Sequence, residues 1–478
     1  MCEPPGQRSR CWTGRVNFNK ALSGRCGYMS TEQQIVYGRT EAGVTHSEHS
    51  SDGAKTGQFW LRSVLSATAS RGGARIWSLA DQSVVSLGNF LTNVILARKL
   101  APHEFGVYAI LLGIVFFIYG AHSALVTYPL SIRGATADKD GLVRLTTFCL
   151  WTTGAVGLVF SAALVVVCLL LGRFCLGLCS ATALFFLIVQ ETLRKALMAH
   201  LRFGDSFLGD ALSYLGQVAV VLLLSLTSRL SPETVFLGMG ATSLLAAGLQ
   251  IVQLKIWSPY VTQAWALLVD FWSLGRWMLL NSVAGIFSTQ LFVWVLAILM
   301  GAAATGTFQA LINILGVANP ITLSAVNLIL PSSARAWRQG GVQAASRVAF
   351  RHGTVAGLVL CLFFSVAMVL PGRVLALFYG VNSSYVRYET ALRILILAMA
   401  VNYVAVIVST VVNAVEQSRI TFLVLMVSAL CSLFVGVPLT LWKGLEGAAI
   451  AMLMGGVIRA VMITLMIGRA EVEVAEAR

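Results

Sequence analysis

Residues 75–114 read RIWSLADQSVVSLGNFLTNVILARKLAPHEFGVYAILLGI, and residues 275–314 read GRWMLLNSVAGIFSTQLFVWVLAILMGAAATGTFQALINI. Aligned at one constant spacing, the two stretches pair Trp77 with Trp277, Gly106 with Gly306, and Tyr108 with Phe308. Coincidence between two apolar segments would explain shared leucines, but a shared tryptophan, glycine and aromatic residue favour a true repeat. The chain is therefore predicted to contain two halves with the same order of elements.

The composition around this repeat is that of a membrane protein. Of the 478 residues, 57% are hydrophobic and 11% are charged, whereas soluble domains carry about 25% charged residues. Lipid is therefore expected to cover most of the surface. The formal net charge of +14 is typical of basic cytoplasmic loops. Nucleic-acid binding is the other interpretation of a basic chain, but no basic cluster stands beside a soluble fold, so no nucleic-acid partner is expected.

Apolar runs of about 20 residues are long enough to cross a bilayer as helices. The sequence predicts twelve of them, at residues 75–98, 105–131, 145–171, 175–197, 208–228, 233–255, 277–300, 305–330, 350–370, 389–413, 420–441 and 445–468. The predicted fold is an all-α polytopic membrane protein with two pseudo-symmetric six-helix halves. Because six is even, both halves have the same orientation, which is typical of one class of transporters.

The predicted organisation follows from these runs and from the charges between them. The expected segments are a disordered cytoplasmic tail (1–56), an N-terminal half (57–256), an interfacial linker helix rich in tryptophan (257–275), a C-terminal half (276–470) and a cytoplasmic C-terminus (471–478). Lysines and arginines are more frequent in the loops on the side of the N-terminus than on the other side. Both termini are therefore expected in the cytoplasm.

Two motifs resemble a known family. The stretch LADQSVVSLGNFLTNVILARKLAPHEFGVYAI (79–110) contains a Pro-x-x-Phe-Gly-x-Tyr element, and GLEGAAIAMLM (444–454) contains Gly-x-x-Gly-Ala-Ala-x-Ala. Both are similar to polysaccharide exporters of the multidrug/oligosaccharidyl-lipid/polysaccharide (MOP) superfamily, which also includes MATE transporters. The likeness covers roughly residues 70–470. Peptidoglycan-precursor flippases usually have an Arg-Asp pair in the first helix. Arg75 and Asp81 are six residues apart and do not form one.

The resemblance implies a flippase of the O-antigen type in the bacterial inner membrane. Its substrate would be a saccharide linked to polyprenyl pyrophosphate. Its other partners would be membrane lipids and the polymerase or export machinery for the polysaccharide. No cofactor is implied.

Ionisable and polar side chains within the spans are the candidate substrate-binding residues, because such groups usually face the protein interior or a water-filled cavity. The predicted set is Arg75, Asp81, Gln82, Asn93, Arg276, Asn281, Gln290 and Asn313. Arginine suits a diphosphate because its planar fork binds two oxygens. The alternative roles are hydrogen bonds between helices for the amides and anchoring at the membrane surface for the bases. Glu191 is expected to pair with Arg194, and Glu416 with Arg419. His122 is expected to be hydrogen-bonded inside the bundle, and the alternative is a proton relay.

Two other functions remain open. A MATE-like exporter of drugs or small cations would need an acid-rich cavity, and the predicted spans contain few acids beyond Asp81. A glycan polymerase or ligase would need a large external loop, and the longest expected one, residues 371–388, is short. The sequence has no GxxxxGK[ST], HExxH or GxSxG motif. We therefore expect no catalytic residues, no metal site and no enzymatic activity.

Overall fold

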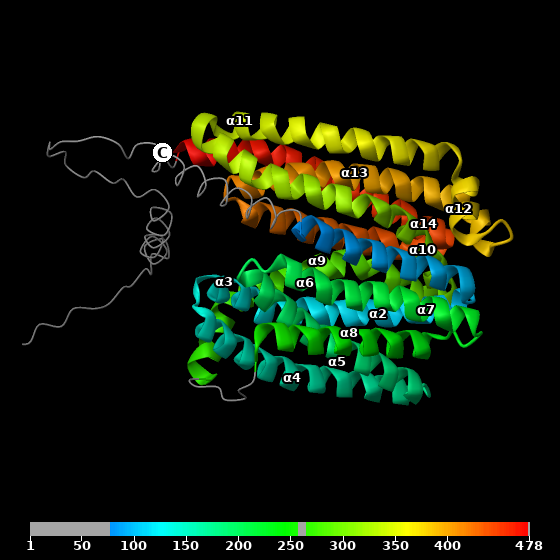
Figure 1. Ribbon diagram of the computed structural model, residues 1–478. Coiled ribbons are helices and arrows are strands. Elements are labelled where there is room, and N and C mark those ends of the chain that lie inside the picture. Colours follow the sequence, from blue (N-terminus) through cyan, green and yellow to red (C-terminus); the bar gives the residue numbers. More distant parts are fainter. Residues whose placement is uncertain (1–76, 257–263, 477–478) are drawn as a thin grey trace, which may run out of the picture. The chain divides into compact units, whose positions relative to one another are not determined.

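The computed structural model describes residues 77–256 and 264–476, with side chains described up to residue 467. Within these ranges the chain forms helices joined by short turns, with no strand (Figure 1). All of these residues belong to one compact unit, Thr68–Arg478. The predicted tail (1–56) and Arg75 lie outside the described residues.

Nine stretches of the described chain are long and apolar enough to cross a membrane: Pro102–Thr136, Lys139–Leu170, Phe174–Ala199, Phe203–Leu226, Pro232–Leu254, Ala264–Met300, Ala302–Val369, Ser384–Ala414 and Ser418–Ile467. Two of them, with 68 and 50 residues, are too long for one crossing of about 20 residues. Their helices break at Gly341 (φ 69°) and Gly444 (φ 61°), where glycine adopts a left-handed conformation at little cost. Each therefore supplies two spans. The helix at residues 77–99 is long enough to cross as well, although it is less apolar than the nine stretches. Counted with them, it brings the described chain to the predicted twelve spans.

The first half begins with the helix at residues 77–99, called the first helix below. It continues through α2 (Pro102–His122), α3 (Tyr128–Thr136), α4 (Lys139–Leu170), α5 (Phe174–Ala199), α6 (Phe203–Asp210), α7 (Gly216–Leu226) and α8 (Pro232–Leu254). Single π-helical turns, η1 (Ser123–Thr127) and η2 (Ala211–Leu215), join α2 to α3 and α6 to α7. Such turns inside α-helices are frequent at functional sites.

The second half comprises α9 (Ala264–Met300), α10 (Ala302–Leu315), α11 (Asn319–Val369), α12 (Pro371–Tyr379), α13 (Glu389–Ala414) and α14 (Ser418–Glu476). Short 3-10 turns, η3 (Gly316–Ala318) and η4 (Ser384–Tyr388), precede α11 and α13. Helix α9 runs from Ala264 to Met300 without a break. The described part of the predicted linker is thus continuous with the seventh span, and the division of the chain at residues 257–275 remains a prediction.

Sequence signals explain where several helices begin. Asp138 accepts a hydrogen bond from the backbone of Gly141 at the start of α4. At the start of α8, Ser231 and Thr234 form a capping box, and Pro232 occupies the first turn. These side chains satisfy backbone N–H groups that have no partner within the helix, and proline there loses no helical hydrogen bond.

The two halves meet where α2 packs against α9 and α10. The repeat-related glycines Gly106 and Gly306 lie at the crossing of α2 and α10. A methyl group on Gly306 would lie 2.7 Å from the backbone nitrogen of Gly106, and one on Gly106 would collide with the carbonyl oxygen of Ala302. The same glycine of each repeat therefore allows the two backbones to touch. A bidentate ion pair from Arg133 on α3 to Asp270 on α9, at 2.6 and 2.9 Å, also links the halves.

Candidate functional site

A guanidinium surrounded by three carboxylates is buried in the first half. Arg194 on α5 makes ion pairs through Nη2 to Asp81 of the first helix at 2.9 Å, through Nε to Asp210 of α6 at 2.5 Å, and through Nη1 to Glu191 at 3.2 Å. The side chain of Arg194 is 12% exposed, and those of Asp81 and Asp210 are 2% and 0% exposed. We call these four residues the Arg194 cluster. It ties three helices together inside the membrane.

Further polar groups surround the Arg194 cluster. Lys195 lies 3.5 Å from Glu191. Ser206 donates a hydrogen bond to Asp81, and Gln190 donates one to Asp210, both at 3.4 Å. The hydroxyl of Tyr119 on α2 interacts with Glu191. The contact of Tyr119 also connects the Arg194 cluster to α2.

A second buried chain of hydrogen bonds runs beside it. The His122 Nε2 atom lies 2.8 Å from the Thr153 hydroxyl, which lies 3.0 Å from the hydroxyl of Thr192. All three side chains are buried. The predicted hydrogen bonding of His122 is confirmed, and it joins α2, α4 and α5 next to Glu191.

The charges of this region do not balance. Asp81, Glu191 and Asp210 face only Arg194 and the partly exposed Lys195, so the five groups carry one net negative charge when all are ionised. An uncompensated charge within hydrocarbon costs at least about 2.5–3.5 kcal/mol. Binding a proton or a cation would remove that charge. The arrangement can therefore hold a positive ion and release it if the helices separate.

A pocket of about 920 Å³ lies on the second half at its border with the first half, which contributes Tyr128 to the lining. We call it the boundary pocket. Its lining comprises Tyr128 of α3, Leu274, Trp277, Met278, Leu280 and Asn281 of α9, Asn413 of α13, and Ser418, Arg419, Thr421, Phe422, Leu423 and Leu425 of α14. Arg419 is exposed, and Thr421 donates a hydrogen bond to Asn413 at 2.9 Å. An arginine suits a phosphate, and amides suit hydroxyl groups.

The residues predicted to bind substrate occupy different places. Asp81 belongs to the Arg194 cluster, and Asn281 lines the boundary pocket. Arg276 is exposed, with its guanidinium 5.8 Å from the ring centre of Trp277, a lining residue of that pocket. Asp81, Asn281 and Arg276 therefore remain candidates. Asp81 belongs to the Arg194 cluster, whereas Asn281 and Arg276 lie at the boundary pocket.

The remaining predicted residues lie elsewhere. Gln290 lies on α9 beside Gly113 of α2, between the halves. The amide of Asn93 donates to the carbonyl oxygen of Asn89 one turn earlier. Asn313 lies next to Tyr379, and Gln82 is exposed. Among the seven predicted residues that the structure describes, no two form a hydrogen bond or ion pair with each other.

Sequence reasoning missed part of the Arg194 cluster. The predicted pairing of Glu191 with Arg194 is confirmed, whereas the contacts of Arg194 with Asp81 and Asp210 were not predicted. Within the described residues, Glu416 and Arg419 do not form an ion pair with each other. Asp210 lies near the start of the predicted fifth span (208–228). The rule that selected Asp81, an acid within an apolar stretch, would have selected it too.

Solved structures with the same fold were found by structural comparison. An inward-facing multidrug resistance MATE family transporter of the MOP superfamily matches with a TM-score of 0.62 at 13% identity, over 82% of this chain and 98% of that one. The lipid II flippase MurJ in an inward closed conformation matches with a TM-score of 0.69 at 13% identity, over 82% and 87% of the two chains. A eukaryotic MATE transporter matches with a TM-score of 0.58 at 12% identity, over 83% and 98%.

Sequence comparison adds nothing to this likeness. No family model matches the chain, and no curated protein matches it significantly. At 12–13% identity the structural matches report on architecture, and they agree with the repeat and the twelve spans. The chain is a multi-pass membrane protein with the fold of the MOP superfamily transporters.

Proposed function

We propose that this protein is a secondary transporter that moves a lipid-linked oligosaccharide, or a related surface polysaccharide unit, across the bacterial inner membrane by alternating access. The observation that carries the proposal is the boundary pocket. It combines Arg419 with the amides of Asn281 and Asn413 and with aromatic side chains at the meeting of the two halves. An arginine can bind the phosphate of such a substrate, and the amides can form hydrogen bonds with the hydroxyl groups of its sugar. MurJ, which shares the fold, is a lipid II flippase.

Alternating access requires that the two halves separate at one end and then at the other. The exposed pair of Arg133 and Asp270 joins α3 to α9, and both helices also contribute residues to the lining of the boundary pocket. An exposed pair contributes about 0–1 kcal/mol, so it can open without a large barrier. The close crossing of Gly106 and Gly306 is the contact on which the halves would pivot.

The Arg194 cluster is the proposed coupling site. Its net negative charge favours binding of a proton or cation, and it is built from three helices of one half. Movement of the first helix relative to α5 and α6 would change the distances of Asp81 and Asp210 from Arg194. Ion binding and helix movement would then be linked, which is the requirement for coupling transport to an ion gradient.

A MATE-like exporter of small cations is the second candidate, because three buried acids are more than the sequence analysis anticipated. Asp81, Glu191 and Asp210 are engaged by Arg194, however. The single excess negative charge of the buried Arg194 cluster suits one coupling ion. The described lining of the boundary pocket carries Arg419 and has no acid for a cationic substrate. The contacts of the described residues therefore favour an anionic substrate.

Replacing Arg419 with alanine is expected to slow transport about 10- to 100-fold, because a hydrogen bond to a charged group contributes about 1.5–3 kcal/mol. Arg419→Lys should retain part of the activity, since lysine keeps the charge without the fork. The measurement is the amount of lipid-linked oligosaccharide trapped on the cytoplasmic leaflet of cells. Arg229→Ala, an exposed arginine between α7 and α8, is the matched control and should change nothing. Equal export by Arg419→Ala and wild type would remove the boundary pocket from the substrate path.

A further inference from the structure

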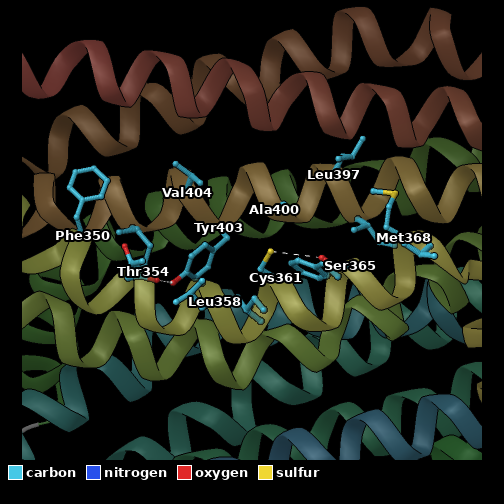
Figure 2. Close-up of a pocket in the computed structure, with 17 residues that line it drawn as sticks. Phe350, Thr354, Leu358, Cys361, Ser365, Met368, Leu397, Ala400, Tyr403 and Val404 are labelled. Atoms are coloured by element: carbon cyan, nitrogen blue, oxygen red, sulfur yellow. Dashed lines mark hydrogen bonds between the residues drawn. The ribbon is translucent and has the colours of Figure 1, made fainter.

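A second cavity lies on the second half, away from the boundary pocket. It is a groove of about 570 Å³ between the C-terminal part of α11 and α13 (Figure 2). Phe350, Thr354, Leu358, Cys361, Ser365 and Met368 line it from α11, and Leu397, Ala400, Tyr403 and Val404 line it from α13. Helix α11 makes its main contacts with other elements of the second half. We call this cavity the α11–α13 groove.

The groove is apolar and is fixed in shape by close helix packing. The hydroxyl of Tyr403 donates a hydrogen bond to the carbonyl oxygen of Gly353 at 2.6 Å. A methyl group on Gly357 would lie 3.2 Å from the Tyr403 ring. Small side chains recur every fourth residue along α11, at Gly353, Gly357, Cys361 and Ser365. Because these four side chains are small and lie on one face of α11, they leave a channel beside the helix.

The length of the groove exceeds one leaflet of a bilayer. Its lining on α11 extends from Phe350 to Val369, which corresponds to about 28 Å at 1.5 Å per residue. A bilayer core is about 30 Å thick, so one leaflet contributes about 15 Å. The groove therefore fits one long chain better than the paired, leaflet-length chains of a phospholipid.

Two arginines mark the end of the groove at Phe350. Arg347 precedes Phe350 by three residues, and Arg351 precedes Thr354 by three, so both emerge on the face of α11 that carries the groove. Both are exposed, and neither is in an ion pair with another residue of the described ranges. Basic side chains at the mouth of a site between membrane helices suit a phosphate headgroup.

We propose that the α11–α13 groove binds the isoprenoid chain of a polyprenyl phosphate or diphosphate lipid, with the phosphate held on Arg347 and Arg351 before it moves to Arg419 in the boundary pocket. This inference rests on the proposed function, because it takes the carrier lipid of the transported saccharide as the occupant. The groove holds the chain along the second half while the headgroup remains at the Arg347 end of the membrane. Chain length, and not only the saccharide, then contributes to substrate selection.

Native mass spectrometry of the purified full-length protein tests the occupant. Polyprenyl phosphate of bacterial chain length and phosphatidylglycerol are added separately at equal concentrations. We expect polyprenyl phosphate to bind at least tenfold more tightly. Ala400→Phe, which fills the groove, should lower that affinity at least tenfold, and so should Arg347→Ala combined with Arg351→Ala. Val359→Phe, on an exposed face of α11 outside the lining, is the matched control and should bind as wild type.

Several outcomes would overturn the inference. These are equal binding of phosphatidylglycerol and polyprenyl phosphate, unchanged binding by Ala400→Phe, or an equal loss in Val359→Phe. If Ala400→Phe does not fold, Thr354→Phe introduces the bulk from the other wall and carries the same expectation. A transport assay separates this inference from the proposed function. Groove variants should lose transport of the long-chain substrate but keep transport of a saccharide on a short isoprenoid. Wild type that transports neither would contradict the proposed function itself.

Discussion

Replacing Arg194 with alanine is expected to destabilise the protein by about 3–5 kcal/mol, because it leaves the carboxylates of Asp81, Glu191 and Asp210 buried without their partner. Removal of one side of a buried ionic cluster costs more than the cluster contributes, since the remaining charges stay in hydrocarbon. The measurement is thermal unfolding in detergent, together with the yield of folded protein in the membrane.

Two further variants separate the charge effect from a loss of packing. Adding Asp81→Asn and Asp210→Asn to Arg194→Ala should restore part of the stability, because the uncompensated charge is then removed. Arg202→Ala is the matched control. Arg202 pairs with Asp205, and it donates a hydrogen bond to the backbone carbonyl oxygen of Gln253 at 3.1 Å. Because the side chains of Arg202 and Asp205 are 39% and 36% exposed, the cost should stay well below that of Arg194→Ala. Equal costs for Arg194→Ala and Arg202→Ala would mean that the Arg194 cluster is not a buried ionic centre.

Replacing Gly106 with alanine is expected to disrupt the contact between the halves and to cost at least about 1–3 kcal/mol by overpacking. The added methyl group would meet the backbone of Ala302, which cannot move aside as a flexible side chain could. Gly306→Ala should have an effect of the same sign, because the second glycine lies against the backbone of Gly106 and Pro102. Unfolding temperature and transport rate both report the change.

Gly154→Ala provides the comparison for this prediction. Gly154 lies on α4, and a methyl group there would meet no atom within 4 Å. Alanine is the better helix former by about 1 kcal/mol, so this variant should be neutral or more stable. If Gly106→Ala and Gly154→Ala shift the unfolding temperature in the same direction, the close crossing of α2 and α10 is not the contact that joins the halves.

The architecture could be predicted because each helix is indicated by the composition of a short, continuous stretch of sequence. Apolar runs mark the part of each helix that lies in hydrocarbon, so all twelve spans were found. Their ends were less accurate: α2 begins at Pro102 and α14 at Ser418, a few residues before the predicted starts. Hydropathy does not register the polar turns that continue a helix beyond the membrane core. The repeat paired Gly106 with Gly306, and the structure shows the reason in the crossing of α2 and α10.

The candidate site could be predicted only in part, because it depends on which helices are neighbours. Asp81 was selected as an acid within a span, but its neighbours on α5 and α6 are more than 100 residues away in sequence. The boundary pocket likewise collects Tyr128, Asn281 and Arg419 from three distant helices. The spacing of these residues along the sequence does not indicate that their side chains lie together in the folded protein. Arg276 was chosen for its position in the repeat, and the structure places it next to the pocket on the exposed Trp277.

Transport in proteoliposomes tests the central claim most directly. The purified protein is reconstituted with an oligosaccharide linked to a long polyprenyl diphosphate, and the fraction that becomes accessible to a lectin in the opposite leaflet is followed over time. We predict translocation well above that of protein-free vesicles, slowed 10- to 100-fold by Arg419→Ala. Translocation no faster than in protein-free vesicles, together with uptake of a fluorescent organic cation by the same preparation, would contradict the account and favour a drug exporter.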